Sequence, residues 1–347
     1  MPEAKAYAAM GPREPLKPWK TPRRDPGPKD VLIEVAYCGI CHSDIHQARD
    51  EWGGSMFPMV PGHEIVGRVA AVGAKVRRFK PGDLAGVGCM VDSCRVCPNC
   101  KDDLEQHCLG HVSFTYNGLE QDQKTPTYGG YASHVVVTED FVLKVPPKLP
   151  LERVAPLLCA GITTYSPLRR FGASKGTRVG VLGLGGLGHM AVKLARAMGS
   201  EVAVLSRSKS KEADAVKLGA HSFVLTTDAE AAAGQAGRYD LIIDTVSGAH
   251  DVGAALGWLK TAGTLVLVGA SPEPLSVGAM PLIGGRRHLA GSLIGGLAET
   301  QEMLDFCARE KVLSDVEVVA FKDVNAAYER VLCGDVRFRF VLDLKTL

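Results

Sequence analysis

The sequence predicts an α/β protein with two domains, one an irregular β domain and the other built around a doubly wound parallel sheet. With 347 residues, the chain is long enough for two domains of ordinary size. Up to about residue 155, short β-branched runs alternate with Gly, Pro and Asp, which is typical of strands joined by turns. Beyond that residue, strand-like and helix-like segments alternate in the order of βαβ units.

The first part of the chain has the short, irregular strands of a mostly antiparallel domain. The expected strands are Val31–Ala36, Ile65–Val72, Leu84–Val91 and Tyr131–Val137. The segment 111–128 is polar and shows no period, so the sequence assigns it no element beyond a long loop.

The second part predicts six strands in βαβ order, and hence one parallel sheet. The expected strands are Arg178–Gly183, Val202–Ser206, Ser222–Leu225, Tyr239–Thr245, Gly263–Gly269 and His288–Ile294. Helical periodicity fills the gaps, most plainly over His189–Met198 and Ala249–Leu259.

The end of the chain reads as a helix over Glu299–Glu310 followed by a strand over Val336–Leu342. Charged residues occupy alternate positions of that strand, which does not suit a buried parallel strand. We therefore expect the tail to rejoin the first domain. The expected domain boundaries are 1–158 and 298–347 for the first domain, with 159–297 for the sheet domain.

Composition and charge exclude several classes of protein. The formal net charge is +2 and there is no basic run, so neither a nucleic-acid nor a membrane partner is expected. No apolar run is long enough to span a bilayer. The start, MPEAKAYAAMGPREP, lacks a charged-then-apolar leader. We expect a cytoplasmic protein.

Four cysteines follow the pattern C-x2-C-x2-C-x7-C: Cys94, Cys97, Cys100 and Cys108. Two-residue gaps let a tight turn aim consecutive sulfurs at one tetrahedral metal, and zinc binds thiolates at roughly 2.3 Å. Four thiolates leave no open position, so this zinc is expected to be structural. The alternative is two disulfides or four unrelated thiols, but in a reducing compartment this spacing favours a metal.

A glycine motif follows the first strand of the predicted sheet. It comprises Gly183, Leu184, Gly185, Gly186, Leu187 and Gly188, which is G-x-G-x-x-G between a strand and an amphipathic helix. In this context Gly183 permits the tight turn, Gly185 lets the backbone approach a pyrophosphate and Gly188 allows close helix packing. The motif therefore predicts dinucleotide binding.

The end of the next strand indicates which dinucleotide binds. An NAD site usually places Asp or Glu there for the ribose hydroxyls, whereas Glu201 lies at the other end of the strand and Glu212 lies in the next helix. The side chains at this position are instead hydroxyls and cations: Ser206, Arg207, Ser208 and Lys211. They suit a 2′-phosphate, which predicts NADP(H). The alternative is that Arg207 and Lys211 are only a solvated surface.

Three further motifs carry soft metal ligands. GICHSD contains Cys41, PGHE contains His63 beside Glu64, and LLCAG contains Cys159. Spacing alone does not unite residues so far apart, and taken singly each cysteine is more often a small buried hydrophobe. Cys38 competes with Cys41, because the two are themselves in C-x2-C spacing.

Taken together, GICHSD, PGHE, the four cysteines, LLCAGITTY and GLGGLG resemble the zinc-dependent medium-chain alcohol dehydrogenases. The resemblance covers essentially the whole chain and is closest to the NADP-dependent cinnamyl-alcohol-dehydrogenase-like branch, which includes bacterial aldehyde reductases. It implies a GroES-like catalytic domain, a Rossmann domain, and an active site in the cleft between them. It also implies two zinc ions per chain and hydride transfer between NADPH and aryl or aliphatic aldehydes.

Residue by residue, the resemblance implies Cys41, His63 and Cys159 as ligands of a catalytic zinc with an open fourth position, with Glu64 beside the metal. Ser43 would touch the substrate oxygen and His46 would pass the proton to solvent, a role that suits a histidine; alternatively His46 is an ordinary surface residue. Further cofactor contacts would be His42, Thr163, Val268, Gly269, Ala270, Ser292, Ile294 and Arg339, although Arg339 in an alternating strand could simply face water.

An apolar substrate slot is expected from Trp52, Met56 and Ile294, and such a slot suits aryl or medium-chain aldehydes. A lone Trp is more commonly a core residue. A dimer paired through the dinucleotide domains is typical of such relatives. Two other functions remain open: an NAD-dependent polyol dehydrogenase of the same superfamily, and a non-catalytic protein that binds zinc and nucleotide.

Overall fold

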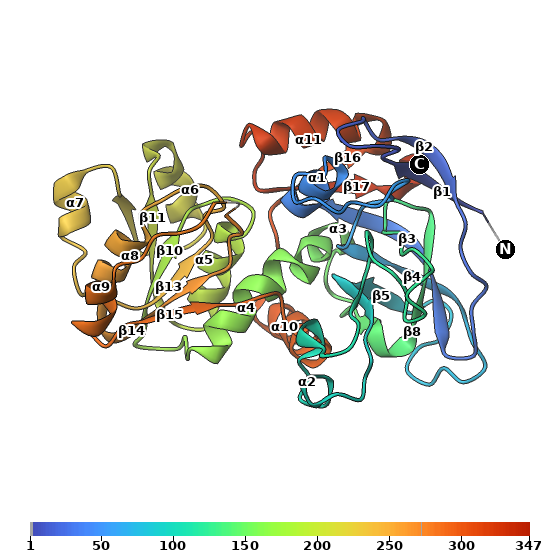
Figure 1. Cartoon of the computed structure of the whole chain (residues 1–347), viewed down its shortest axis with the longest axis horizontal. Helices are drawn as coiled ribbons and strands as arrows, with labels where there is room; N and C mark the ends of the chain where they lie inside the picture. Colours follow the sequence, from blue (N-terminus) through green and yellow to red (C-terminus); the bar gives the residue numbers. More distant parts are fainter. Residues whose placement is uncertain (1–2, 272) are drawn as a thin grey trace. The chain divides into compact units, whose positions relative to one another are not determined.

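The structure is a computed structural model that describes residues 3–271 and 273–347 (Figure 1). The chain forms two compact units. The first comprises the described residues up to Cys159 together with Gly295–Leu347, and the second comprises Ala160–Ile294. Cys159 and the segment 295–297 thus belong to the first unit, whereas the sequence boundaries assigned them to the second.

A seven-stranded sheet forms the centre of the first unit, in the order β16-β17-β3-β4-β5-β9 with β8 also pairing with β3. Two small hairpin-like sheets, β1-β2 and β6-β7, accompany it. The strands are β1 (Ala4–Ala8), β2 (Lys17–Thr21), β3 (Asp30–Ile40), β4 (Ile65–Val72), β5 (Leu84–Val87), β6 (Met90–Asp92), β7 (Ser113–Phe114), β8 (His134–Thr138), β9 (Leu143–Lys144), β16 (Val316–Ala320) and β17 (Arg339–Asp343).

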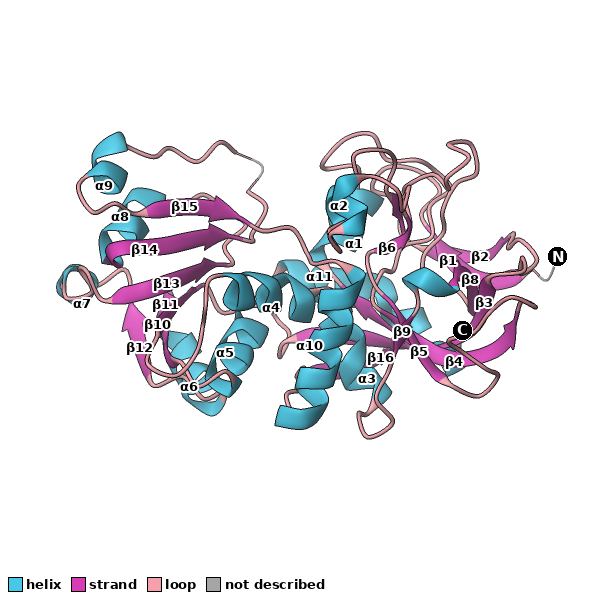
Figure 2. Cartoon of the chain, turned by 90° about the horizontal axis from the view of Figure 1, so that it is seen from below, coloured by secondary structure: helices cyan, strands magenta, loops and turns pink. Residues whose placement is uncertain are grey.

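The helices of the first unit are short, apart from one near its end (Figure 2). They are α1 (His42–Ala48), α2 (Pro98–Lys101), α3 (Leu151–Val154), α10 (Leu297–Glu310) and α11 (Val324–Leu332), with 3₁₀ turns at Glu105–His107, Glu139–Phe141, Ala155–Leu158, Phe321–Asp323 and Leu344–Thr346.

The second unit is a six-stranded parallel sheet in the order β12-β11-β10-β13-β14-β15. Numbered along this unit, the order is 3-2-1-4-5-6, which is the Rossmann arrangement and confirms the predicted doubly wound sheet. The strands are β10 (Arg178–Leu182), β11 (Glu201–Ser206), β12 (Ser222–Leu225), β13 (Tyr239–Asp244), β14 (Leu259–Leu267) and β15 (His288–Gly291).

The helices of the second unit are α4 (Ala160–Arg170), α5 (Gly188–Ala197), α6 (Glu212–Lys217), α7 (Ala229–Ala233), α8 (Val252–Trp258) and α9 (Ala279–Ile283), with a 3₁₀ turn at Lys209–Lys211. None of the helices in the described part of the chain is long and apolar enough to cross a membrane.

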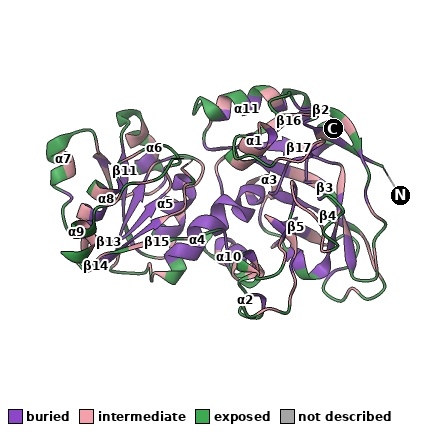
Figure 3. Ribbon diagram, in the orientation of Figure 1, coloured by how far each residue is buried: buried purple, intermediate pink, exposed green. Residues whose placement is uncertain are grey.

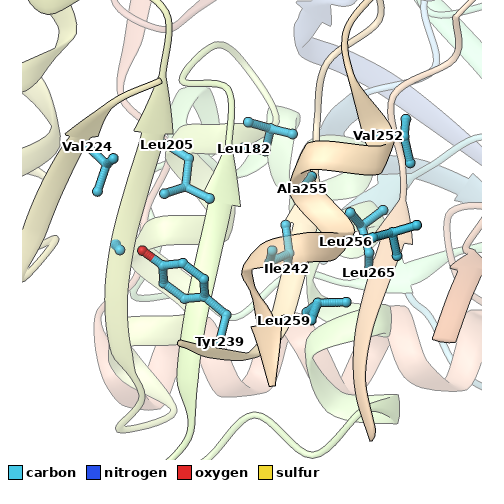
Figure 4. Packing of buried hydrophobic residues seen from close by; sticks show 11 residues of the cluster. Leu182, Leu205, Val224, Tyr239, Ile242, Val252, Ala255, Leu256, Leu259 and Leu265 are labelled. Carbon is cyan, nitrogen blue, oxygen red and sulfur yellow. The ribbon is translucent and has the colours of Figure 1, made fainter. Parts of the chain in front are cut away.

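The core of the second unit forms because its strands are almost continuously apolar. On one face of the sheet, α8 packs Val252, Ala255 and Leu256 against strand residues such as Ile242 and Leu265 (Figure 4). All five are at most 1% exposed, and the strands of this unit appear buried in Figure 3. Burial of each large aliphatic side chain contributes roughly 1.5–3 kcal/mol to the stability of the fold. This packing therefore stabilises the sheet that carries the glycine motif.

Several predicted elements end elsewhere in the structure. The run Leu84–Val91 is interrupted because the carbonyl groups of Gly88 and Cys89 accept hydrogen bonds from Thr115, so β5 and β6 are separate strands. The helix expected over Ala249–Leu259 begins only after Asp251, whose carboxylate caps it by accepting the N–H of Ala254 at 2.9 Å.

The tail rejoins the first unit, but the reason given by the sequence was wrong. β17 pairs antiparallel with β3 and also parallel with β16. Its residues Arg339, Phe340 and Val341 are all buried, so charge at alternate positions did not mark a solvent-facing strand. A buried arginine is tolerated here because it is paired with a carboxylate, described below.

Candidate active site

The four cysteines of the C-x2-C-x2-C-x7-C motif converge in the first unit, where each offers one sulfur within 4.8 Å of the others. The Cys97 and Cys100 sulfurs lie 3.5 Å apart, and Cys97 and Cys108 lie 4.0 Å apart. Four thiolates at ~2.3 Å from a tetrahedral zinc have sulfurs about 3.8 Å apart, so the donor set fits zinc. No position is left for a substrate.

Backbone N–H groups in the turn prepare one of these thiols, that of Cys97, for a metal. Cys97 is the N-cap of α2, and its sulfur accepts the N–H groups of Leu109 at 3.4 Å and Cys100 at 3.5 Å. These hydrogen bonds lower the pKa of Cys97 to about 6. Because only the thiolate ligates, the turn favours the protonation state that zinc requires.

A second cluster joins residues from three distant segments of the first unit. Cys41 precedes α1, His63 and Glu64 precede β4, and Cys159 follows the 3₁₀ turn Ala155–Leu158. One ligand atom of each lies within 4.8 Å of the others, and all four residues are buried. The Cys41 and Cys159 sulfurs are 3.9 Å apart, again close to the spacing expected around zinc. Two thiols and an imidazole leave a fourth position, so the set fits a metal with an open site.

The two thiols of this cluster share a hydrogen bond. Their contact lowers the pKa of Cys41 and raises that of Cys159. Because only thiolates ligate, binding of zinc requires both thiols to lose their protons.

Asp44 orients the imidazole and was not singled out by the sequence. It is fully buried, and Oδ1 accepts the N–H of Gly62 at 3.0 Å and lies 3.1 Å from Nδ1 of His63. Oδ2 accepts the N–H of Cys41 at 2.9 Å. Occupation of Nδ1 leaves Nε2 available as the metal ligand. The sequence does contain one indication of this role. Asp44 is an acidic residue at the third position of a helix that starts after Cys41, and a residue at that position can form a capping box, as Asp44 does.

Glu64 and Arg339 form a buried ion pair beside this cluster. Arg339 Nη2 donates to Glu64 Oε1, and the two side chains are 5% and 0% exposed. Oε2 of Glu64 has no hydrogen-bond partner among the described residues. Burial raises the pKa of Glu64 to about 7, against the opposing effect of Arg339. A role for Arg339 at the cofactor phosphates stays a prediction.

Cys38, the competing thiol, lies outside the second cluster. It is fully buried in β3 and its sulfur is 3.8 Å from the carbonyl oxygen of Gly39. A Cβ placed at Gly62 would lie 2.7 Å from that sulfur, so Cys38 packs against the backbone of the PGHE turn. Burial raises the pKa of its thiol well above the usual value.

The predicted relay residues lie on one face of α1. Ser43 Oγ is 3.7 Å from the sulfur of Cys41, and His46 follows three residues later. Nδ1 of His46 is hydrogen-bonded to Glu51, and its ring lies 5.0 Å from that of Trp52. Glu51 was not predicted from the sequence, because it lies outside the motif.

The remaining predicted residues of the first unit surround α1. His42 is exposed, with its ring 6.1 Å from that of His46. Trp52 is 47% exposed, so it is not a core residue. The backbone N–H of Met56 donates to Asn117 Oδ1 at 2.8 Å, which ties its loop to the segment 111–128.

The first two residues of the glycine motif, Gly183 and Leu184, line a cavity of about 980 Å³ in the second unit. Gly183 has φ +90°, in the left-handed region that favours glycine. A Cβ at Gly188 would lie 2.3 Å from the Gly183 carbonyl oxygen, whereas one at Gly185 would meet nothing within 4 Å. Gly185 thus leaves room for a ligand and Gly188 allows close packing, as expected for the pyrophosphate turn.

The hydroxyl and cationic residues at the end of β11 and in the turn after it line the same cavity: Ser206, Arg207, Ser208 and Lys211. Glu201 lies at the opposite end of β11, where it pairs with Arg178 at 2.9 Å. Glu212 pairs with Lys209. Two cations and two hydroxyls at the cavity fit the 2′-phosphate of NADP(H). The turn itself, residues 206–211, contains no carboxylate.

The other predicted cofactor residues occupy loops and a helix of the second unit. Val268, Gly269 and Ala270 follow β14, and the N–H groups of Val268 and Gly269 donate to the Asp244 carbonyl oxygen at 2.9 and 3.1 Å. Ser292 follows β15 and donates its N–H to the Leu267 carbonyl oxygen at 3.1 Å. The remaining two, Thr163 in α4 and Ile294 at the end of the unit, are buried.

Comparisons with known proteins agree with this geometry. Residues 27–147 match the family described as "Alcohol dehydrogenase GroES-like domain", and residues 186–309 match "Zinc-binding dehydrogenase". The chain is 53% identical to "NADP-dependent alcohol dehydrogenase C 1" of Mycolicibacterium smegmatis, over 99% of this chain and 98% of that protein.

Two solved structures resemble the whole chain. A cinnamyl alcohol dehydrogenase of Sorghum bicolor has a TM-score of 0.97 at 44% identity, covering 99% of this chain and 98% of that one. The CAD protein of Helicobacter pylori, solved as a complex with NADP(H), has a TM-score of 0.92 at 44% identity with the same coverage.

Proposed function

The chain belongs to the zinc-binding alcohol dehydrogenase family, and from this premise we propose that it transfers hydride between NADPH and the carbonyl carbon of small aldehydes. The convergence of Cys41, His63 and Cys159 carries the proposal, because two thiols and an imidazole with an open fourth position suit a catalytic rather than a structural metal. When bound, zinc supplies a Lewis acid and NADPH supplies the hydride.

The side chains of the first unit hold and move the proton that balances hydride transfer. Ser43 Oγ, next to Cys41, donates to or accepts from the substrate oxygen. His46, three residues along α1 and partly exposed, exchanges that proton with solvent while Glu51 holds its ring. Glu64 keeps one oxygen without a partner among the described residues, so it can approach the ligand cluster when the open position changes occupant.

NADP(H) is the proposed cofactor and aryl or aliphatic aldehydes are the proposed substrates. Arg207 and Lys211 support the first choice, and the Helicobacter pylori relative is described as a complex with NADP(H). Trp52 supports the second, because a half-exposed indole beside His46 offers a flat apolar surface. The Sorghum relative is named for an aryl alcohol.

The proposal is tested by metal content and turnover together. Protein isolated without chelator should contain two zinc ions per chain, and it should oxidise NADPH with an aryl aldehyde and with an aliphatic one. Cys159→Ala should retain one zinc and lose turnover, whereas Cys333→Ala, at an exposed cysteine, should change neither. Turnover by Cys159→Ala at the rate of the unsubstituted protein would contradict the proposal.

A homodimer joined through the second unit is proposed as the assembly. β15 is an edge strand among the described residues, with unpaired N–H and C=O groups along one side. Apolar side chains near it are exposed: Met280 by 69%, Ile283 by 68% and Leu293 by 50%. Light scattering should give twice the chain mass, and Ile283→Asp should give a monomer; a monomeric unsubstituted protein would contradict this assembly.

A cytoplasmic location is also proposed. All ten cysteines are free thiols, and six of them lie in clusters that ligate only when reduced. A reducing compartment keeps them in that state. Fractionation of cells that express the natural gene should recover the protein with cytoplasmic markers, and recovery with secreted proteins would contradict this location.

A further inference from the structure

His250 and Asp244 form a hydrogen-bonded pair beside the cavity of the second unit. Asp244 ends β13, and the side chains of Asp244 and His250 are 0% and 8% exposed. Nε2 of His250 lies 2.6 Å from Asp244 Oδ2. Nδ1 lies 2.8 Å from the carbonyl oxygen of Gly248. Both ring nitrogens of His250 therefore face oxygen atoms.

This arrangement holds a proton. A carbonyl oxygen only accepts, so Nδ1 must carry a hydrogen, and a neutral imidazole then has none on Nε2. The 2.6 Å contact between His250 Nε2 and Asp244 Oδ2 needs a second hydrogen, shared between ring and carboxylate. If that proton left to solvent, a nitrogen lone pair would face a carboxylate oxygen. Burial raises the pKa of Asp244, which favours retention of the proton.

The pair closes the loop 245–251 onto the sheet. At the start of the loop, Thr245 Oγ1 donates to the Leu182 carbonyl oxygen at 2.9 Å, and the Val246 N–H donates to Asp244 Oδ1 at 3.1 Å. A Cβ at Gly183 would lie 2.9 Å from Thr245 Oγ1, so the loop rests directly on the glycine motif. At its far end, the contact between His250 and Asp244 brings the loop back.

The closed loop is one wall of the dinucleotide cavity. Val246, His250 and Asp251 line it, together with Leu182 at the end of β10 and with Gly183 and Leu184 of the glycine motif. Apart from His250, the titratable or charged residues that line the cavity are Arg207, Lys211 and Asp251. Both cations are placed for the cofactor phosphate. Asp251 caps α8 through its contact with Ala254.

We propose that the Asp244–His250 pair is a proton-dependent clasp, in which His250 positions the loop 245–251 as a wall of the cofactor cavity. The inference rests on the proposed binding of NADP(H). Loss of the shared proton to solvent opens the contact, the loop leaves the glycine motif and the cavity loses that wall. Cofactor affinity is thereby linked to a proton that takes no part in hydride transfer.

The test compares cofactor binding by the unsubstituted protein, His250→Gln and the control His221→Gln. His221 is exposed and does not line the cavity. NADPH and NADH dissociation constants are measured by fluorescence between about pH 6.5 and 9.5, where the 2′-phosphate stays ionised and Lys211 stays charged. In the unsubstituted protein, both constants should rise together as the pH increases.

His250→Gln should bind both cofactors about tenfold more weakly at neutral pH, as expected for loss of a hydrogen bond to a charged group, and should lose the pH dependence. His221→Gln should follow the unsubstituted protein. A pH profile that is flat in the unsubstituted protein, or that survives in His250→Gln, overturns the clasp.

Histidine ¹⁵N spectra give a second readout that a purely structural role would not move. The His250 signal is assigned by its absence from His250→Gln or His250→Asn. Its Nε2 chemical shift should change between about pH 6.5 and 9.5 in step with the cofactor dissociation constants, and an Nε2 shift that stays constant over this range overturns the clasp. If the unsubstituted protein binds neither cofactor while this signal is present, the proposed function fails and the clasp does not.

Discussion

Asp44 Oδ1 lies 3.1 Å from Nδ1 of His63, a buried imidazole beside the thiols of Cys41 and Cys159. The carboxylate is itself fixed, because it also accepts the N–H groups of Gly62 and Cys41. The Tyr116 ring stacks on His63 at 5.7 Å. The imidazole is therefore held in both tautomer and orientation before any metal binds, which reduces the cost of assembling the ligands.

Replacing Asp44 by Asn should weaken the catalytic zinc by about 10–100-fold, the usual effect of removing a carboxylate that orients a metal-binding histidine. Competition with a chromophoric chelator measures this directly. The four-cysteine zinc in the same chain is an internal control, since Asp44 contacts none of its ligands among the described residues. Retention of both zinc ions at unchanged affinity would show that Asp44 does not position His63.

Two glycines of the nucleotide motif should respond differently to alanine. In Gly188→Ala the new methyl would meet the Gly183 carbonyl oxygen at 2.3 Å, so we expect a loss of about 1–3 kcal/mol in the free energy of unfolding. In Gly185→Ala the methyl meets no protein atom within 4 Å, so stability should stay within about 0.5 kcal/mol while NADPH affinity falls.

Urea denaturation and NADPH fluorescence separate the two effects. If Gly185→Ala binds NADPH as tightly as the unsubstituted protein, the glycine is not needed for approach of the pyrophosphate.

Much of the second unit was predictable because its signals are local. Buried parallel strands are continuous apolar runs, and Ser222–Leu225 was placed at its observed bounds. Boundaries failed where long-range contacts decide them. Tyr131, expected at the start of a strand, donates its N–H to the Pro61 carbonyl oxygen, and its own carbonyl accepts from Tyr7, so β8 begins only at His134.

The site was less predictable than the fold, because its geometry depends on residues far apart in the chain. Spacing identified the four-cysteine site, whose ligands lie within one turn-rich segment. It did not unite Cys41, His63 and Cys159, which only the resemblance grouped. Glu64 and Arg339 are separated by 275 positions, and no local pattern indicates that they pair.

Arg207 should determine the preference for NADPH over NADH. A guanidinium hydrogen bond to a phosphate contributes roughly 1.5–3 kcal/mol, so Arg207→Ala should lower kcat/KM with NADPH by about 10–100-fold and leave that with NADH nearly unchanged. The matched control is Lys209→Ala, because Lys209 is nearby but pairs with Glu212 and does not line the cavity. Equal losses with both cofactors would place Arg207 outside the 2′-phosphate site.

Replacing one partner of the Glu64–Arg339 pair should lower the free energy of unfolding more than replacing both. Arg339→Met leaves a buried carboxylate without its cation, which typically costs about 3–5 kcal/mol, whereas the double variant Glu64→Gln, Arg339→Met removes both charges and should recover most of that loss. Urea denaturation with zinc content measured on each sample checks this. Additive effects of the two substitutions would mean that the side chains are not coupled.

Loss of the four-cysteine zinc should loosen the first unit locally. Cys97 and Cys108 are only partly buried, and the segment between them has the short helix α2 and one 3₁₀ turn as its regular structure among the described residues. The metal is therefore the main constraint on this segment. In Cys100→Ala one zinc should be lost, and amide hydrogen exchange over 92–114 should become faster. Exchange in β10 to β15 should not change, because those strands belong to the other unit.

The control is Cys333→Ala, which removes an exposed thiol outside both clusters. Unchanged exchange in Cys100→Ala after loss of its zinc would show that the peptide, rather than the metal, holds the segment.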